Sequence, residues 1–320
     1  MLLSRVADSL YWIGRYLERA EHTARVIDVR LDAGLDRIPG AGGWDFAGLY
    51  ADLQFTEPST PPAMPSELVE SAIFDTANRE SVIACVTSAR ENARQVREEI
   101  SADMWEHVNG LYLRLREARS EGTWASRSHY LSRLIIEGVH LFQGITDATM
   151  GHGEGWQYLQ VGRFLERVDV TAALLGQHVV KGSVGPGAPG PVNQIEWVAL
   201  LRACSALEPY CRVYTADIRP RRIAEFLLLN SEFPRSIRYA ASCVESSLRT
   251  IALHGAKGSG GRAERLAGRL HASLDYGQID EILTDDPQMY LQGITRQVDQ
   301  IHAAVYQTYL AYPIDTALPA

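Results

Sequence analysis

The sequence lacks the features of exported, disulfide-stabilised and membrane-spanning proteins. Its four cysteines show no C-x-x-C spacing and are too few for a disulfide framework in a chain of 320 residues. No run approaches the roughly 18 apolar residues of a membrane span, and the opening MLLSRVADSLYW has polar residues where a signal peptide needs an apolar region. We therefore expect a reduced, cytoplasmic protein that does not associate with membranes.

Motifs for nucleotide binding and nucleophilic catalysis are also missing. The chain has no G-x-S-x-G, no G-x-x-x-x-G-K-[ST], and no G-x-G-x-x-G that follows an expected strand. A net charge of −8 gives no global attraction to nucleic acid. These absences indicate no bound cofactor, no nucleic-acid partner and no evident catalytic set.

The residues that are present favour helices. Alanine, leucine, arginine and glutamate dominate, and no hairpin dipeptide separates alternating apolar runs, so we expect an all-α fold without a sheet. Gly- and Pro-rich stretches predict flexible loops near residues 36–65, 181–193 and 255–262. The expected helices are Ser4–Leu35, Pro65–Thr76, Arg79–Ile100, Ala102–Ala118, Ser128–Met150, Gly155–Val180, Ile195–Leu207, Pro220–Leu229, Pro234–His254, Ala263–Ala272 and Ile279–Leu310, with an interruption near Pro287 left open.

One short sequence motif occurs twice in the chain. Gly14–Arg25 reads GRYLERAEHTAR, Gly162–Ala173 reads GRFLERVDVTAA, and seven of the twelve positions are identical at an offset of 148. A weaker echo follows at an offset of 155, because Ser81-Val82 and Ser236-Ile237 each open a long expected helix. The repeat indicates that one helical unit was duplicated.

Duplicated units commonly pack about a pseudo-two-fold axis. We therefore expect a single domain over 1–320, a helical bundle of two pseudo-symmetric halves at approximately 1–125 and 126–320. Each half contributes a long Glu-Arg helix, and these two helices are expected to meet. Glu18 would then pair with Arg167, and Glu166 with Arg19.

The charged residues of the first copy share a helix face. Tyr11, Arg15, Glu18 and His22 fall on one side, opposite the apolar stripe. Three interpretations remain open: a buried ion-pair network, an anion or substrate site built on the same pairs, and a solvated surface with weak i,i+3 pairs. The candidate residues are Tyr11, Arg15, Glu18, Arg19, Arg163, Glu166 and Arg167.

A second group of arginines suggests anion binding. Arg90, Arg94 and Arg97 fall at i, i+4 and i+7, and three guanidinium groups on one face can hold a phosphate or carboxylate. The alternative is pairing with nearby acids such as Glu98 and Glu99. The candidate anion-binding set is Arg90, Glu91, Asn92, Arg94, Arg97 and Arg235.

One pattern could suggest a metal. Glu137 and His140 form E-x-x-H, the spacing used by di-iron carboxylate bundles. Such a centre needs two of these motifs and two further carboxylates, and the sequence has no second E-x-x-H. We therefore assign no metal ligands, and a metal-dependent bundle stays the least favoured alternative.

Several motifs together resemble a known family. The stretches MLLSRVADSLYWIGRYLERAEHTARVIDV, ARENARQVREEISADMWEHVNGLY, MGHGEGWQYLQVGRFLERVD and FLLLNSEFPRSI are similar to the alpha-E domain, a bacterial all-helical family with a repeated Glu-Arg motif. The residues that carry the resemblance are Ser4, Arg5, Tyr11, Trp12, Arg15, Glu18, Arg19, Arg25, Arg90, Glu91, Asn92, Arg94, Trp105, Met150, Trp156, Gly162, Arg163, Glu166, Arg167, Pro234, Arg235 and Ser236.

The resemblance implies a cellular context. Proteins of this kind are typically encoded beside, or fused to, a circularly permuted ATP-grasp ligase, often with a transglutaminase-like peptidase, in systems that make or modify peptides. The expected function is thus a helical accessory protein that binds such a ligase or its peptide substrate. An enzyme or amide-transfer component with a Glu/Arg-lined site is the alternative.

Overall fold

The computed structural model describes residues 2–35, 46–57, 62, 64–122, 128–181, 191–215, 217–254, 261–284 and 286–311. Within these ranges it contains helices and no strand, which confirms the all-α prediction. None of the described helices is long and apolar enough to cross a membrane. The helices are α1 (Ser4–Leu35), α2 (Phe46–Asp52), α3 (Pro65–Phe74), α4 (Val82–Gln95), α5 (Ala102–Glu121), α6 (Ser128–Thr149), α7 (Glu154–Lys181), α8 (Pro191–Ala203), α9 (Leu207–Tyr214), α10 (Pro220–Leu229), α11 (Ile237–His254), α12 (Arg262–Asp275), α13 (Ile279–Thr284) and α14 (Pro287–Val305), followed by a π-helical turn at Tyr306–Leu310.

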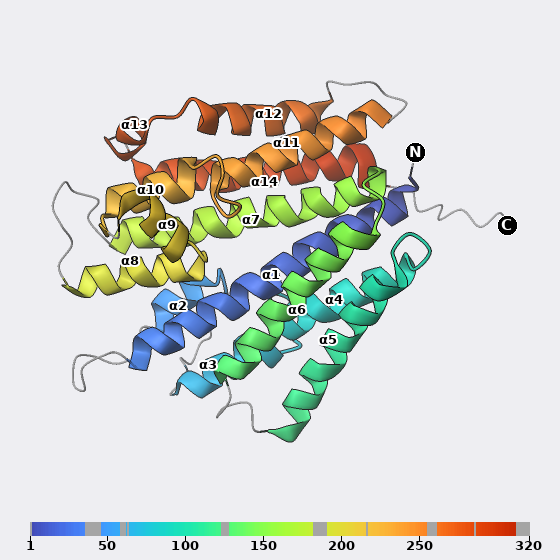
Figure 1. Cartoon of the computed structure of the whole chain (residues 1–320), viewed down its shortest axis with the longest axis horizontal. Coiled ribbons are helices and arrows are strands. Elements are labelled where there is room, and N and C mark those ends of the chain that lie inside the picture. Colours follow the sequence, from blue (N-terminus) through green and yellow to red (C-terminus); the bar gives the residue numbers. More distant parts are fainter. Residues whose placement is uncertain are drawn as a thin grey trace.

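Two long helices, α1 and α7, lie side by side through the middle of the molecule (Figure 1). On one side, α1 packs against α4 and α6, and α5 closes the group by contacting both. On the other side, α7 packs against α11 and α14, and α12 contacts both of those. Each central helix is therefore buried between its own partners and the other central helix.

The burial of α1 explains its sequence. Leu10, Ile13 and Ile27 lie on the apolar stripe and have no exposed surface. Tyr11 and Glu18, on the opposite face, have none either, because that face meets α7. A charged face that would normally contact water is thus enclosed, so its charges need partners within the protein.

Helix ends follow local side-chain chemistry. Ser81 caps α4 by accepting a hydrogen bond from the Ala84 N–H at 3.3 Å, and Ser101 caps α5 in the same way at 3.2 Å. Gly122 ends α5 in the left-handed conformation, with φ 65°, which glycine adopts without steric cost.

The structure differs from the sequence expectations at several helices, one being α4, which ends at Gln95 instead of Ile100. Helix α2 lies within the expected loop of residues 36–65, because Leu49 and Tyr50 are buried in the core despite the flanking glycines. The helix expected to end at Leu207 ends at Ala203 as α8, and a separate helix, α9, begins at Leu207. The last helix divides at Pro287, which occupies the first turn of α14 after the Asp286 cap.

The other expected loop residues lie mainly outside the described ranges. This holds for 36–45, 58–61, 63, 182–190 and 255–260. At the loop edges, α7 extends to Lys181, α8 begins at Pro191, and α12 begins at Arg262.

Candidate functional site

The two central helices approach most closely at the repeated glycines. A Cβ atom added to Gly14 would lie 2.3 Å from the carbonyl oxygen of Leu159, and one added to Gly162 would lie 2.0 Å from that of Tyr11. Leu159 follows Tyr11 by the same 148 positions that separate the two glycines. The contact is therefore made in both directions, and only glycine lets the two backbones approach so closely.

The same crossing brings the repeated Glu-Arg pairs together. Arg167 of α7 donates two hydrogen bonds to the Glu18 carboxylate of α1, at 2.6 and 2.7 Å. In the opposite direction, Arg19 of α1 binds Glu166 of α7 through Nε and through Nη2 at 3.1 Å, and Arg15 Nε adds a bond of 2.6 Å. We refer to Arg15, Glu18, Arg19, Glu166 and Arg167 as the Glu-Arg network.

Further charges extend the network on the Glu18 side. Arg235, which precedes α11, pairs with Glu21 and lies 3.5 Å from Glu18. Glu21 also binds Arg25 and accepts from His140 Nε2 at 3.0 Å. Side chains from α1, from α6 and from the segment before α11 thus converge on the two buried carboxylates of Glu18 and Glu21.

Two similar loops supply one charge each. The Ser81 hydroxyl donates to the Asp75 carbonyl before α4, and the Ser236 hydroxyl donates to the Asn230 carbonyl before α11. All of these positions correspond at the offset of 155. The residue before each serine differs in charge: Glu80 pairs with Arg19, whereas Arg235 pairs with Glu21.

Arg15 links the network to an aromatic group. It donates to the Tyr11 hydroxyl at 3.2 Å, and that hydroxyl lies 2.8 Å from Nδ1 of His302 on α14. Since Arg15 occupies the tyrosine oxygen as a donor, the hydroxyl proton is directed at the imidazole. Burial and the charge of Arg15 lower the pKa of His302, which favours the neutral ring that accepts this proton.

The arginines keep the buried glutamates ionised. Burial alone would raise the pKa of Glu166, but the charges and hydrogen bonds of Arg15 and Arg19 hold it at about 2. Burial likewise opposes ionisation of Glu18 and Glu21, and the nearby arginines outweigh it, so the pKa of each is lowered. The exposed fractions of Glu18, Glu166 and Arg167 are 0%, 1% and 3%.

Asp169 is the counterpart of Glu21 in the second copy, but its surroundings shift the carboxyl pKa in the opposite direction. Arg25 corresponds to Ala173 there, so no arginine follows Asp169 one turn later. Burial, together with the negative charges of Glu166 and Asp299, raises the pKa of Asp169 to about 7. The second copy therefore carries a carboxyl group that the fold holds partly protonated at neutral pH.

Asp169→Asn is expected to raise the melting temperature, and by more at pH 8 than at pH 5. The pKa of Asp169 in the folded state lies above the ordinary 3.8. Its contribution to the stability of the folded state is therefore fully present only below about pH 4, and it is lost as the pH rises through 7. The amide carries no charge at either pH. Thermal melts at both pH values check this, with the exposed Asp147→Asn as control. An equal gain at both pH values would contradict the assigned environment.

The repeated Glu-Arg dipeptides also decide the family. A family model described as a predicted alpha-helical domain with a conserved ER motif matches residues 2–310. The chain belongs to the alpha-E family. Glu18-Arg19 and Glu166-Arg167 are two Glu-Arg dipeptides of this chain, and both lie at the contact of the two central helices.

The curated relatives of this alpha-E chain are distant. Uncharacterized proteins of Mycobacterium bovis and Mycobacterium tuberculosis are 25% identical to it over 350 residues. The match covers 97% of the alpha-E chain and 37% of each relative, so the chain spans little more than a third of the relatives' length. No solved structure matches the alpha-E chain.

The residues of the expected anion-binding set have partners of their own within the protein, and Arg235 pairs with Glu21. Arg90 lies 4.8 Å from the Tyr112 ring centroid and donates to Asn109 at 2.7 Å. Arg94 binds Glu91 at 2.8 Å, so the acid partner is Glu91 rather than Glu98 or Glu99. Two other residues of the candidate anion-binding set also contact residues close to them in sequence. Arg97 lies beyond the end of α4, over the Trp105 ring, and Asn92 donates to the Ser88 carbonyl.

Glu137 and His140 have separate partners. Glu137 accepts from Arg133 at 3.0 Å on the surface of α6, whereas His140 binds Glu21. Within the described ranges, no three His, Cys, Asp or Glu side chains are grouped so that they could hold a metal ion.

One end of the Glu-Arg network reaches a hollow. Arg19 Nη1 binds Glu80, and both residues line a cavity of about 550 Å³ between α1 and the start of α4. Trp12 and Tyr16 form part of its wall with stacked rings 5.0 Å apart. The side chains of Arg19 and Glu80 are 19% and 44% exposed. The network is therefore enclosed at Glu18 and accessible at Arg19.

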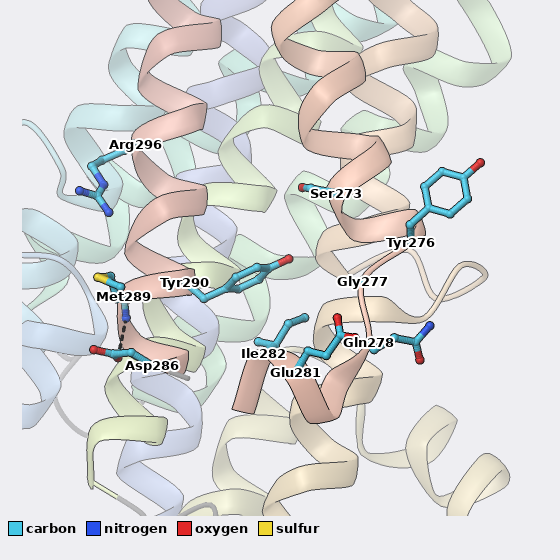
Figure 2. Close-up of a pocket in the computed structure, with 10 residues that line it drawn as sticks. All are labelled: Ser273, Tyr276, Gly277, Gln278, Glu281, Ile282, Asp286, Met289, Tyr290 and Arg296. Atoms are coloured by element: carbon cyan, nitrogen blue, oxygen red, sulfur yellow. Dashed lines mark hydrogen bonds between the residues drawn. The ribbon is translucent and has the colours of Figure 1, made fainter. Parts of the chain in front are cut away.

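A larger hollow, about 630 Å³, lies at the end of the α12–α14 layer. Figure 2 shows the Tyr290 ring extending from α14 toward the end of α12, where Ser273 lies, while Tyr276 points away. Tyr276 and Met289 are among the most exposed large apolar side chains of the described residues, at 81% and 59%. Among the described residues that line this hollow, no ion pair like that of Arg19 and Glu80 is found.

Sequence reasoning did not identify Glu21, Glu80 and His302 as partners of the network. The offset of 155 contained a usable signal, since it aligns Glu80 with Arg235 before the two capping serines. It could not show that the two loops turn back onto the Glu-Arg helices, because that depends on the packing of α4 and α11.

Proposed function

We propose that this alpha-E chain is a helical binding protein that acts with a circularly permuted ATP-grasp peptide or amide ligase and a transglutaminase-like peptidase. The observation that supports this most is the use of the Glu-Arg motif. Its carboxylates are buried and fully engaged by arginines, so they offer neither a free base nor a nucleophile. The motif holds α1 to α7, which leaves the outer helix surfaces for binding.

The relatives are consistent with a protein that works jointly with others. In the mycobacterial proteins the matching region is part of a longer chain, and most of that chain lies outside the match. A region similar to this alpha-E chain therefore occurs within longer proteins, which supports a domain that acts together with other protein.

We further propose that the domain consists of two related halves. Helices α3 and α4 correspond to α10 and α11 at the offset of 155, including the first-turn prolines Pro65 and Pro220. Helix α6 packs with α1 and α5, and α14 packs with α7 and α12. The boundary that fits these contacts follows α6, near residue 150, rather than the expected position near 125.

Co-purification followed by analytical ultracentrifugation with the neighbouring ATP-grasp ligase tests the proposal. We expect a complex at micromolar concentrations and a change in ligase turnover. Tyr276→Ala and Tyr130→Ala, which remove exposed rings on opposite layers, show which surface takes part. No complex and no effect on turnover would overturn the accessory role.

A second candidate function is an enzyme or amide-transfer component. The observation in its favour is the hollow that Arg19 and Glu80 share, since one network arginine reaches solvent there. Loss of product formation by the ligase system in Glu80→Gln, with the complex intact, would favour this function. A metal-dependent bundle is the third candidate, and elemental analysis of untagged protein decides it.

A further inference from the structure

The hollow at Arg19 is the first of three that adjoin. Arg79 and Glu80 line both this hollow and a second one of about 420 Å³, which extends past Asn78 to Gln54. Gln54 in turn lines a third hollow of about 180 Å³ against α7 and α14. Because neighbouring hollows share wall residues, they adjoin one another in a row. We call it the hollow row.

The first hollow combines an aromatic wall with charge. The stacked rings of Trp12 and Tyr16 provide a flat apolar surface. Glu80 is engaged by Arg19, whereas exposed Arg79 makes no ion pair with any described residue. A guanidinium group at such a position offers a forked set of donors that matches a carboxylate.

The third hollow is lined by four glutamines together with small and apolar residues. Gln54, Gln177, Gln288 and Gln292 contribute to its wall, and their side chains make no hydrogen bonds within the described part of the chain. Each glutamine offers both donors and an acceptor, as a peptide backbone does. Gln54 also has a left-handed backbone, with φ 58°, which is uncommon for a residue other than glycine and is enriched at functional sites.

We propose that the hollow row binds an extended peptide that carries a carboxylate. The carboxylate pairs with Arg79, an apolar side chain beside it packs on Trp12 and Tyr16, and the following backbone amides hydrogen-bond to the glutamines. This inference rests on the proposed binding function and names the class of ligand. Arg79, rather than the repeated Glu-Arg residues, is thus the recognition residue.

A nucleotide fits the same surface less well. Its base could stack on Trp12, but its phosphates would lie beside the half-exposed carboxylate of Glu80. One free arginine does not neutralise two or three phosphates, and the net charge of −8 adds repulsion. A single carboxylate requires only Arg79, so the peptide is favoured.

Equilibrium dialysis read by mass spectrometry tests the inference on the full chain alone. Three pools of acetylated pentapeptides ending in Phe, Leu or Tyr are compared: one with a free C-terminal carboxylate, one amidated without acidic residues, and one amidated with an internal Glu. ADP is dialysed in parallel. We expect one carboxylate pool to be retained about tenfold more than the neutral pool, and that pool identifies the source of the carboxylate.

Arg79→Ala should reduce retention of the carboxylate pool to that of the neutral pool. Arg249→Ala is the matched control, because Arg249 is an exposed arginine on α11 outside the hollow row, and it should leave retention unchanged. Equal retention of all pools, insensitivity to Arg79→Ala, or retention of ADP alone would overturn the inference. These outcomes do not depend on the ligase, so they are distinct from failure of the proposed complex.

Discussion

Replacing Glu18 with alanine is expected to lower the free energy of unfolding by about 3–5 kcal/mol, the range seen when one partner of a buried ion pair is removed. Arg167 would lose both of its carboxylate bonds while 3% exposed, and Arg235 would lose a nearby opposite charge. No water can easily replace the lost carboxylate, because Glu18 itself has no exposed surface. Urea denaturation at neutral pH measures the change.

Glu166→Ala should cost a similar amount, since Glu166 is bound by Arg15 and Arg19 and is 1% exposed. The control is Glu137→Ala, which removes an exposed glutamate paired with Arg133 and should cost at most about 1 kcal/mol. Melting temperatures of both network variants within about two degrees of the unmodified chain would mean that the pairs are not structural.

Gly162→Ala is expected to be as damaging, with a loss of about 3 kcal/mol or more. The new methyl group would lie 2.0 Å from the Tyr11 carbonyl oxygen, which is backbone and cannot rotate away. Helices α1 and α7 would have to separate, and the bonds between Glu18 and Arg167 would lengthen with them. Gly14→Ala meets the Leu159 carbonyl oxygen at 2.3 Å and should behave alike.

Gly144→Ala provides the matched control, because a Cβ there has nothing within 4 Å in the middle of α6. Without a clash, the higher helix propensity of alanine should stabilise the chain by about 0.5–1 kcal/mol. Opposite signs for Gly162→Ala and Gly144→Ala are therefore expected in one series of thermal melts. Similar small gains at both positions would show that the helices do not cross as described.

The repeat made the contact between α1 and α7 predictable, because the same sequence motif on two helices implies matching environments. It predicted that the two Glu-Arg helices meet and led to the pairing of Glu18 with Arg167, whereas the close contact at Gly14 was not predicted. Helix ends were predictable where a single residue type decides them, as at Pro220. Residues such as Leu49 in α2 were not, because burial by distant helices, rather than local propensity, makes that segment helical.

The different electrostatic environments of the two copies could not be predicted from the sequence. Glu21 and Asp169 are conservative replacements at equivalent positions, yet one pKa is lowered and the other raised to about 7. The cause is the set of charges around each carboxyl group: Arg235 and Arg25 lie near Glu21, whereas Glu166 and Asp299 lie near the buried Asp169. A repeat predicts which groups meet between the two central helices, but not which charged residues of other segments surround each copy.

The most direct measurement of the central claim is a double-mutant cycle of Glu18 and Arg167. Glu18→Gln and Arg167→Met keep similar side-chain sizes, so both single variants and the double variant should remain folded enough for urea denaturation. If the pair joins α1 to α7, the coupling free energy should be about 1.5–3 kcal/mol, whereas Glu18 and the distant Arg94 should be additive within about 0.5 kcal/mol. A coupling of less than about 0.5 kcal/mol between Glu18 and Arg167 would contradict the account.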